Sequence, residues 1–430
     1  MTGSETPAMR AFEPWMLTNL ATGAVMGAFV VLLIPPFITQ QTGSPARAGV
    51  VFAVMALAGL TGPWFGRIAD RYGAHRAVYT LSFVGLTLSF VVLALDGTGD
   101  VYSPIAGVLL GASLSAKAAV GTGLLVGSGA PEPVQARQLT VSNLLIFGGQ
   151  ILGGLLVAGL HLGSISFVGQ FWCAAALVAA GGVLAAVTTG APARRVRTAA
   201  RPAGVARVPT DAVDDPEPAS HADVAASARP SFRQIIASPF GALMGAIALA
   251  SLCMAVLSSQ VANILPTVFS ISQAGVSGLV AFSGLLGIVA VVASGPWLAR
   301  SGPAPALTAS FVLRGAGFVG LALAGLFAGG PVAAILAAML YLGIAVSGSL
   351  QRSPLPRAAV LLTRVGASEA NGLVSAAGAF GAFIGCLAAG FVADAASYEA
   401  VLWMSAIAAV APFALLPILR HSIRAARAAR

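Results

Sequence analysis

Twelve long apolar runs follow one another along this 430-residue chain, and they constrain its fold more than any other feature. A helix needs about 20 apolar residues to cross the hydrocarbon core of a bilayer, which is about 30 Å thick. Backbone that faces lipid must satisfy its hydrogen bonds internally, and the runs are too long and too uniformly apolar for barrel strands. The runs therefore predict an all-α membrane protein with twelve transmembrane helices. The predicted helices cover residues 15–38, 48–66, 77–95, 103–127, 138–160, 165–189, 239–265, 276–298, 306–328, 331–350, 369–392 and 399–419.

The composition agrees with a membrane protein. Hydrophobic residues make up 57% of the chain and charged residues 9%, whereas soluble globular proteins carry about 25% charged residues. A net charge of +9 is also typical of nucleic-acid-binding proteins, so the location of the charges matters. If the N-terminus is cytoplasmic, 20 of the 23 basic residues fall in cytoplasmic segments, and Arg47 alone falls in an outer loop. The charge therefore predicts a multi-pass cell-membrane protein with both termini in the cytoplasm and no nucleic-acid partner.

The runs form two sets of six, separated by a polar segment. Residues 191–232 are rich in Ala, Pro and Arg, then acidic, and lack apolar periodicity, which predicts a flexible cytoplasmic linker. Residues 1–190 and 233–430 are then two six-helix bundles. Three fragments recur at offsets of 231 to 233 residues, which indicates a duplicated, parallel repeat. The matching pairs are Ile34-Pro35 with Leu265-Pro266, Gly62-Pro63-Trp64 with Gly295-Pro296-Trp297, and Gly149 and Gly153 with Gly381 and Gly385.

The segment after the second run carries a motif. Residues 66–76 read GRIADRYGAHR and resemble the signature GxLADRxGxRR between spans 2 and 3 of the major facilitator superfamily. The resemblance covers the whole transmembrane part of the chain. It implies a secondary transporter with two pseudo-symmetric six-helix bundles that works by alternating access. The matching residues are Gly66, Ala69, Asp70, Arg71, Gly73 and Arg76, and the departures are Ile68, Ala74 and His75.

In that family the motif is associated with stabilising the outward-facing state, so the resemblance implies a conformational latch here. Gly66 and Gly73 permit a tight helix exit and return. Asp70 is expected at the cytoplasmic face, where it can pair with Arg71 or Arg76 or lie against a helix N-terminus. The alternative is a solvated loop whose arginines only fix topology.

Two further patterns resemble the same family. Residues 117–123 read KAAVGTG and are similar to the span-4 pattern RxxQGxG, linked to proton coupling, with Lys117 in place of Arg and Val120 in place of Gln. Residues 149–154 read GQILGG and are similar to the antiporter pattern GPxxGG, with Gln150 in place of Pro. These motifs are most similar to those of drug:proton antiporters. Small residues also let helices approach closely, which predicts helix packing at Gly121, Gly123, Gly149, Gly153, Gly154, Gly381 and Gly385.

Lys117 lies near the middle of the fourth predicted helix, where a cation costs roughly 2.5–3.5 kcal/mol. All acidic residues lie outside the predicted spans or at their ends, so no intramembrane carboxylate neutralises it. Three interpretations stay open. Lys117 binds an anionic group of the substrate; or it cycles a proton during transport, because burial disfavours the charged amine; or it is structural and bonds to carbonyls, Asn143 or Gln150. Arg314 in the ninth span is expected to snorkel toward the cytoplasm or pair with a carbonyl rather than bind substrate.

Few neutral polar residues are available to line a cavity. Polar groups at membrane depth usually face the protein interior, where they contact a solute or join helices. A cavity that is otherwise apolar suits an amphipathic or lipophilic solute better than a sugar. The candidates are Asn19, Gln260, Asn263 and Tyr341, with Asn143, Gln150 and Asn371 on flanking helices.

The sequence lacks the motifs of the main enzyme classes. It has no GxxxxGK[ST] phosphate loop, no credible Ser/His/Asp arrangement and no paired intramembrane aspartates. Its three cysteines are far apart and its four histidines do not cluster, so no disulfide framework, metal site or cofactor is expected. The chain is therefore predicted not to be an enzyme.

The sequence favours proton-linked efflux of a small amphipathic or drug-like compound by a monomer in the lipid bilayer. One alternative is an importer or exchanger of a small organic anion, with Lys117 as the anion ligand. A second alternative is a non-transporting membrane scaffold or sensor. A costly charge at the membrane midplane argues against the second.

Overall fold

The computed structural model describes residues 12–96, 102–126, 132–199, 232–327, 330–352, 354–363 and 367–428, and these residues are almost entirely helical. Twelve helical stretches among them are long and apolar enough to cross a membrane. Each stretch overlaps one predicted run. The prediction of an all-α membrane protein with twelve transmembrane helices is therefore confirmed.

The first six spans form a bundle that we name the N half. Its first span contains a 3-10 segment and a π segment, and its second span is divided into two helices by a turn at Leu60 and Thr61. The N half consists of η1 (Pro14–Leu17), α1 (Thr18–Ala24), η2 (Val25–Phe29), α2 (Val30–Thr42), α3 (Pro45–Gly59), α4 (Gly62–Tyr72), α5 (His75–Leu95), α6 (Tyr102–Val126), α7 (Glu132–Leu162), α8 (Phe167–Thr188) and α9 (Gly190–Ala199).

The last six spans form a second bundle, the C half. Two short helices, α10 and α15, supplement its six spans. The C half consists of α10 (Phe232–Ile236), α11 (Pro239–Phe269), α12 (Gln273–Ser301), α13 (Pro303–Leu326), α14 (Pro331–Arg352), α15 (Pro354–Leu362), α16 (Ala367–Ala395), α17 (Tyr398–Val410), η3 (Ala411–Leu415) and α18 (Leu416–Ala428).

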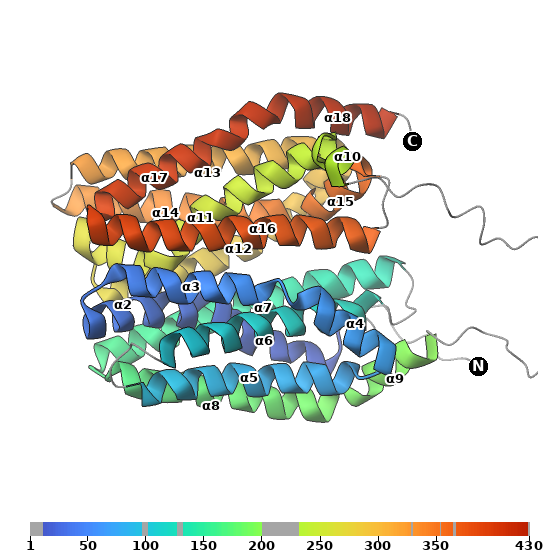
Figure 1. The fold of residues 1–430 in the computed structure, drawn as a ribbon, viewed down its shortest axis with the longest axis horizontal. Coiled ribbons are helices and arrows are strands. Elements are labelled where there is room, and N and C mark those ends of the chain that lie inside the picture. Colours follow the sequence, from blue (N-terminus) through green and yellow to red (C-terminus); the bar gives the residue numbers. More distant parts are fainter. Residues whose placement is uncertain are drawn as a thin grey trace, which may run out of the picture.

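The two halves form two layers, with the N half in blue to green and the C half in yellow-green to red (Figure 1). α9, α10 and the end of α18 all lie at one end of the bundle. We name this the linker end and the opposite end the far end. An even number of spans in each half requires the halves to share one orientation, as a parallel repeat does.

Helices at the linker end extend beyond the predicted spans. The second span continues as α4 to Tyr72, and α14 continues to Arg352. Hydropathy marks the apolar core of a membrane, but an amphipathic helix leaves that core without ending. Gly66 therefore lies inside α4, so its predicted role at a helix exit is wrong. Gly73 has a φ of 62° and does end α4, as predicted.

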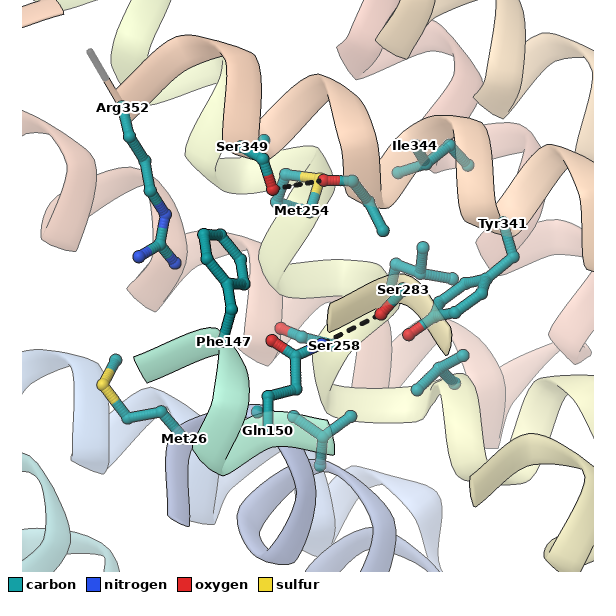
Figure 2. Close-up of a pocket in the computed structure, with 16 residues that line it drawn as sticks. Met26, Phe147, Gln150, Met254, Ser258, Ser283, Tyr341, Ile344, Ser349 and Arg352 are labelled. Carbon is teal, nitrogen blue, oxygen red and sulfur yellow. Dashed lines mark hydrogen bonds between the residues drawn. The ribbon is translucent and has the colours of Figure 1, made fainter. Parts of the chain in front are cut away.

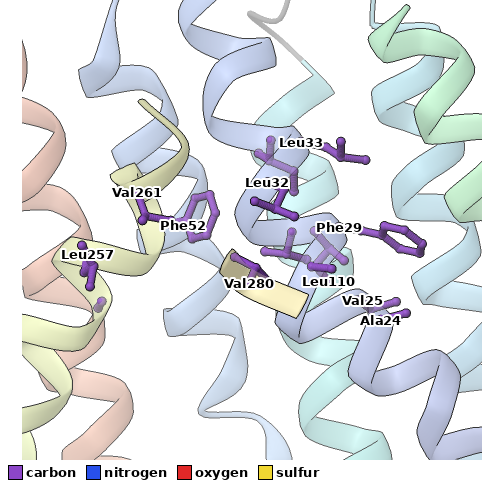
Figure 3. Packing of buried hydrophobic residues seen from close by; sticks show 14 of the residues in the cluster. Ala24, Val25, Phe29, Leu32, Leu33, Phe52, Leu110, Leu257, Val261 and Val280 are labelled. Carbon is purple, nitrogen blue, oxygen red and sulfur yellow. The ribbon is translucent and has the colours of Figure 1, made fainter. Parts of the chain in front are cut away.

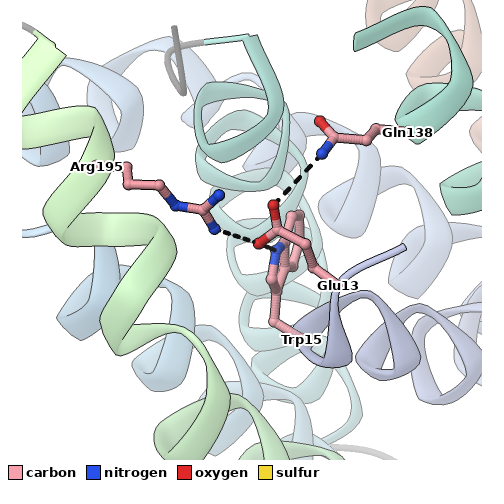
Figure 4. Close-up of polar contacts among 4 residues, drawn as sticks. All are labelled: Glu13, Trp15, Gln138 and Arg195. Carbon is pink, nitrogen blue, oxygen red and sulfur yellow. Dashed lines mark hydrogen bonds and ion pairs between the residues drawn. The ribbon is translucent and has the colours of Figure 1, made fainter. Parts of the chain in front are cut away.

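The predicted linker begins with a helix rather than a flexible segment. α9 packs against α5, α6 and α8, so its ten residues belong to the N half. Arg195 of α9 donates to Glu13 at 2.5 Å (Figure 4). Glu13 also accepts from Trp15 Nε1 at 3.1 Å and Gln138 Nε2 at 3.4 Å, which ties α9 to the first and fifth spans. The rest of the predicted linker, residues 200–231, lies outside the described residues.

The glycines of the sequence repeat occupy equivalent helix contacts in the two halves. A Cβ on Gly149 of α7 would clash with the Leu20 carbonyl of α1. A Cβ on Gly381 of α16 would clash with the Ala248 carbonyl of α11. Span 5 thus packs on span 1 in the N half as span 11 packs on span 7 in the C half. Gly153 and Gly385 repeat these close approaches one turn later, against Ala24 and Leu252 respectively.

The remaining predicted packing glycines differ from one another. Gly154 of α7 lies against Ala281 of α12, so it permits a close approach between the two halves. A Cβ on Gly121 or Gly123 would make only ordinary contacts, with Tyr79 at 3.4 Å and His75 at 3.9 Å. These two glycines therefore do not mark a close helix approach.

The halves share one continuous apolar core. It contains Phe29 and Phe52 of the N half together with Leu257, Val261 and Val280 of the C half (Figure 3). Between the halves, α2 packs on α11, α3 on α16 and α7 on α12. This arrangement places α2, α7, α11, α12 and α14 around a shared central space.

Candidate functional site: a cavity between the halves

A cavity of about 210 Å³ lies between the two halves. The N half contributes η2, α2 and α7 to its wall, and the C half contributes α11, α12 and α14 (Figure 2). Most of the wall is apolar, with a few polar groups and one cation. The lining residues are Met26, Gly27, Val31, Phe147, Gln150, Met254, Leu257, Ser258, Val261, Ser283, Tyr341, Ile344, Ala345, Gly348, Ser349 and Arg352.

Gln150 lines this cavity, as predicted, and also joins the halves. Its Nε2 donates to Ser283 Oγ at 2.9 Å and to the Val280 carbonyl at 3.1 Å, both in α12. Gly27 lies within the π segment η2, and a Cβ there would lie 2.5 Å from Gln150 Cγ. The glycine therefore leaves room for Gln150, and π segments of this kind often occur at functional sites.

One face of α14 forms the C-half wall. Tyr341, Ala345, Gly348 and Arg352 recur at the three- or four-residue spacing that places side chains on one helix face. Tyr341 is buried, and its predicted place in the cavity agrees with the structure. The sequence pattern does not predict Arg352 in the cavity. The tenth predicted helix ends at residue 350, so Arg352 falls in a predicted cytoplasmic loop. The same spacing, continued one turn further, would have found it.

Arg352 is the one charged residue among the described residues that line the cavity. Its guanidinium carbon lies 5.1 Å from the ring centroid of Phe147 in the opposite half, a cation–π geometry. The side chain is exposed and lies in the last turn of α14. Because this turn is at the linker end, the cavity is accessible from that end.

Lys117 of α6 is buried within the N half rather than in the cavity wall. Its Nζ donates to Asn19 Oδ1, and Asn19 Nδ2 donates to Ser142 Oγ at 2.9 Å. Nζ also lies 5.9 Å from the ring centroid of Tyr79. The expected partners, Asn143 and Gln150, are therefore wrong. Asn19 was predicted as a cavity residue. Its amide oxygen instead accepts a hydrogen bond from Lys117, because α1 and α6 both direct these side chains into the interior of the N half.

Gln260 and Asn263 do not line the cavity either. Asn263 Nδ2 donates to Thr39 Oγ1 and to Gln260 Oε1, both at 3.0 Å, and Gln260 Nε2 donates to the Pro45 carbonyl at 3.2 Å. These bonds join α11 to the N half near the far end. Asn143 is half-buried and lies outside the cavity wall. The side chain of Asn371 lies outside what the structure describes.

In the motif between spans 2 and 3, Asp70 lies against the N-terminus of α5, one of the predicted arrangements, where it pairs with His75, the first residue of that helix. Asp70 Oδ1 lies 3.0 Å from His75 Nε2, so neither Arg71 nor Arg76 is its partner. Arg76 Nη2 instead donates to the Ala186 carbonyl of α8 at 2.8 Å, and Arg71 lies over the ring of Tyr72. The side chain of Asp70 is 77% exposed, so its carboxylate is accessible at the linker end.

Arg314 of α13 is buried and does not snorkel toward an end of the bundle. Its Nη2 donates to Gln351 Oε1 at 2.6 Å and its Nε to Ser347 Oγ at 3.2 Å. Both acceptors lie on α14, so Arg314 fastens the cavity-lining helix to α13. Among the described residues, His, Cys, Asp and Glu form no group of three that could hold a metal ion.

Twelve helices long and apolar enough to span a membrane, in two halves with a mostly apolar cavity between them, form the architecture of many secondary transporters. Residues 15–365 match the Major Facilitator Superfamily, and the chain belongs to this family. The matched region includes the cavity-lining segments of both halves. The prediction of a major facilitator fold is therefore confirmed.

Several solved structures share this fold. A variant of the nucleoside transporter NupG aligns with a TM-score of 0.71 and 13% identity, over 94% of this chain and 98% of that one. A variant of the peptide transporter POT in complex with sulfate aligns with a TM-score of 0.69 and 13% identity, over 96% and 95%. A bacterial homolog of the human lysosomal transporter Spinster, inward-facing and unoccupied, gives 0.63 and 15%, over 99% and 98%. No curated protein sequence matches the chain significantly.

Proposed function

We propose that this transporter exports small amphipathic compounds across the cell membrane in exchange for protons, as a monomer working by alternating access. The observation that carries the proposal is the cavity, whose wall comes from both halves. Rocking of one half against the other changes which end such a cavity faces. Its apolar wall and its few polar groups, among them Gln150 and Tyr341, suit an amphipathic solute.

The distribution of charge supports a cytoplasmic linker end. Cytoplasmic segments of membrane proteins carry an excess of Lys and Arg. Arg47 is at the far end, at the start of α3. The described arginines on α9, α10 and α18, which lie at the linker end, include Arg194, Arg195, Arg197, Arg233, Arg420 and Arg424. The cavity then faces the cytoplasm, the side from which an exporter takes its cargo.

Lys117 is the proposed proton carrier. Its described partners, Asn19 and the ring of Tyr79, are neutral, so the cost of a buried charge is only partly offset. A small rearrangement of Asn19 therefore shifts the balance between the charged and neutral amine. The alternative in which Lys117 binds an anionic substrate receives no support from this arrangement, because Lys117 is outside the cavity wall.

Two substitutions of Lys117 test the coupling in proteoliposomes loaded with cationic, neutral and anionic fluorescent dyes. We expect Lys117→Ala to lose pH-driven uphill transport but to keep facilitated exchange. Lys117→Arg retains the positive charge but does not release a proton, because a guanidinium stays protonated in proteins. It should therefore lose uphill transport as well.

Ser142→Ala is the matched control, since it removes a hydrogen-bond partner of Asn19 but no titratable group. Undiminished pH-driven uphill transport by Lys117→Ala would contradict proton coupling through this residue. Absence of transport for every dye by the wild-type protein would favour the scaffold alternative.

A further inference from the structure

The cavity contains a cation, Arg352, that has no anionic partner among the described residues. Within the described part of the chain, Arg352 makes no ion pair and no hydrogen bond, and its contact is the face of Phe147. The buried cations Lys117 and Arg314 are satisfied differently, since both donate to amide oxygens. A cation–π contact leaves the five N–H donors of a guanidinium largely unused. These donors are available to a ligand.

We propose that Arg352 and Phe147 bind the anionic end of the cargo, so that the substrates are small amphipathic anions such as aromatic carboxylates. This inference rests on the proposed transport function and names its substrate class. A guanidinium presents parallel N–H groups that match the two oxygens of a carboxylate. The aromatic face of Phe147 lies beside it and can contact an aromatic or aliphatic body.

The rest of the wall specifies the other end of such a molecule. From Arg352 and Phe147 toward the hydroxyl of Tyr341, the cavity is lined by Met254 and Ile344 and by the polar groups of Gln150, Ser258 and Ser283 (Figure 2). A ligand with one charged end and an apolar body matches this polarity. The volume of about 210 Å³ is below the roughly 300–1,000 Å³ of sites for drug-sized ligands. The cargo is therefore smaller than a typical drug.

The position of Arg352 also links binding to the conformational cycle. Arg352 belongs to the C half and Phe147 to the N half, so an anion held between them contacts both halves. Closing the linker end would bury Arg352, and an unpaired buried charge is costly. A bound anion removes that cost. The substrate therefore favours closure, and empty transporter with Arg352 unpaired remains open at the linker end.

Three probes of the same shape and different charge test the substrate class: benzoate, benzyl alcohol and benzylamine. We expect benzoate to bind purified wild-type protein in calorimetry and raise its melting temperature, and the other two probes to have no such effect. Arg352→Gln should weaken benzoate binding about tenfold or more, because it removes a charge-assisted pair. Arg352→Lys should retain part of the affinity, since it keeps the charge but not the planar fork.

Arg300→Gln is the matched control. Arg300 is also an exposed arginine in the last turn of a C-half helix, but it is outside the cavity wall. It should bind benzoate like the wild type. Gel filtration and circular dichroism check that each variant is folded, and Arg352→Lys supplies a second variant if Arg352→Gln is not.

Unchanged benzoate binding by Arg352→Gln would overturn the inference. So would binding of benzylamine equal to that of benzoate, or no benzoate binding at all. Proton-driven transport of a cationic dye without benzoate binding would contradict the anionic substrate class and leave the proposed transport function intact. Benzoate binding that requires Arg352, without pH-driven transport of any compound, would contradict only the proton-linked function.

Discussion

At the residue scale, Lys117, Arg314 and Arg352 have no counter-charge among the described residues. Lys117 and Arg314 each donate to an amide oxygen on a neighbouring helix. Such an oxygen partly replaces water without introducing a second buried charge. Arg352 has the ring of Phe147 as its contact instead of a hydrogen-bond acceptor, and this difference distinguishes the cavity cation from Lys117 and Arg314.

The glycines show how closely single residues control helix spacing. We expect Gly149→Ala to lower the melting temperature, because its Cβ would meet the Leu20 carbonyl and overpacking costs about 1–3 kcal/mol. Gly159→Ala in the same helix is the control, since a Cβ there has nothing within 4 Å. Thermal unfolding in detergent measures both. Equal melting temperatures would show that α7 and α1 separate easily at this position.

At the element scale, the hairpin between α4 and α5 is fastened to the rest of the N half. Arg76 donates to the Ala186 carbonyl of α8, and a Cβ on Gly73 would lie 3.2 Å from the side chain of Arg197 on α9. α9 is itself tied to Glu13 through Arg195. The hairpin therefore moves with the N half, and the exposed Asp70 projects from a rigid support.

The proposed latch at Asp70 predicts a shift between the two states. We expect Asp70→Asn to raise the population that is open at the linker end, because the closed state loses a charged contact worth on the order of 1 kcal/mol. Labelling of Ser349→Cys in the cavity, in a chain without its native cysteines, measures access from that end. Glu399→Gln removes an exposed charge at the start of α17 and serves as the control. Equal labelling in both variants would support the alternative, a solvated loop whose arginines only fix the topology.

At the scale of the whole molecule, the halves are joined near the far end and midway along the bundle. Asn263 and Gln260 bond to Thr39 and the Pro45 carbonyl near the far end, and Gln150 bonds to α12 beside the cavity. Gly49 of α3 and Gly390 of α16 bring the backbones of the two halves into close contact. This pattern fits a cavity that is accessible from the linker end.

The contacts near the far end predict a gate. We expect Asn263→Ala to increase labelling of Ser258→Cys from the far side, because it removes a hydrogen bond between the halves, worth about 1 kcal/mol. Gln273→Ala is the control, since Gln273 Nε2 bonds at 2.9 Å to the Ala262 carbonyl within the C half. Accessibility from the far side that does not differ between the two variants would exclude Asn263 as a gate residue.

Much of the fold was predictable because it depends on properties summed over many residues. Membrane helices follow from about 20 consecutive apolar residues, and the family resemblance rests on a contiguous motif at residues 66–76. The candidate site was predictable only in part. Gln150 and Tyr341 line the cavity, whereas Lys117, Asn19, Gln260 and Asn263 bond elsewhere. Polarity reveals that a side chain faces protein, but not which neighbour it faces.

The sequence by itself determined the class of fold, the number of spans, the duplication and the uneven distribution of positive charge. These are local or additive properties, and each can be read without knowing which helices touch. Only the tertiary structure decided the partners, because they depend on helix rotation and on contacts between residues far apart in the chain. In that structure Lys117 lies outside the cavity wall and Arg352 lies in it. The charge that bears most directly on cargo therefore lies in a helix turn beyond the predicted span.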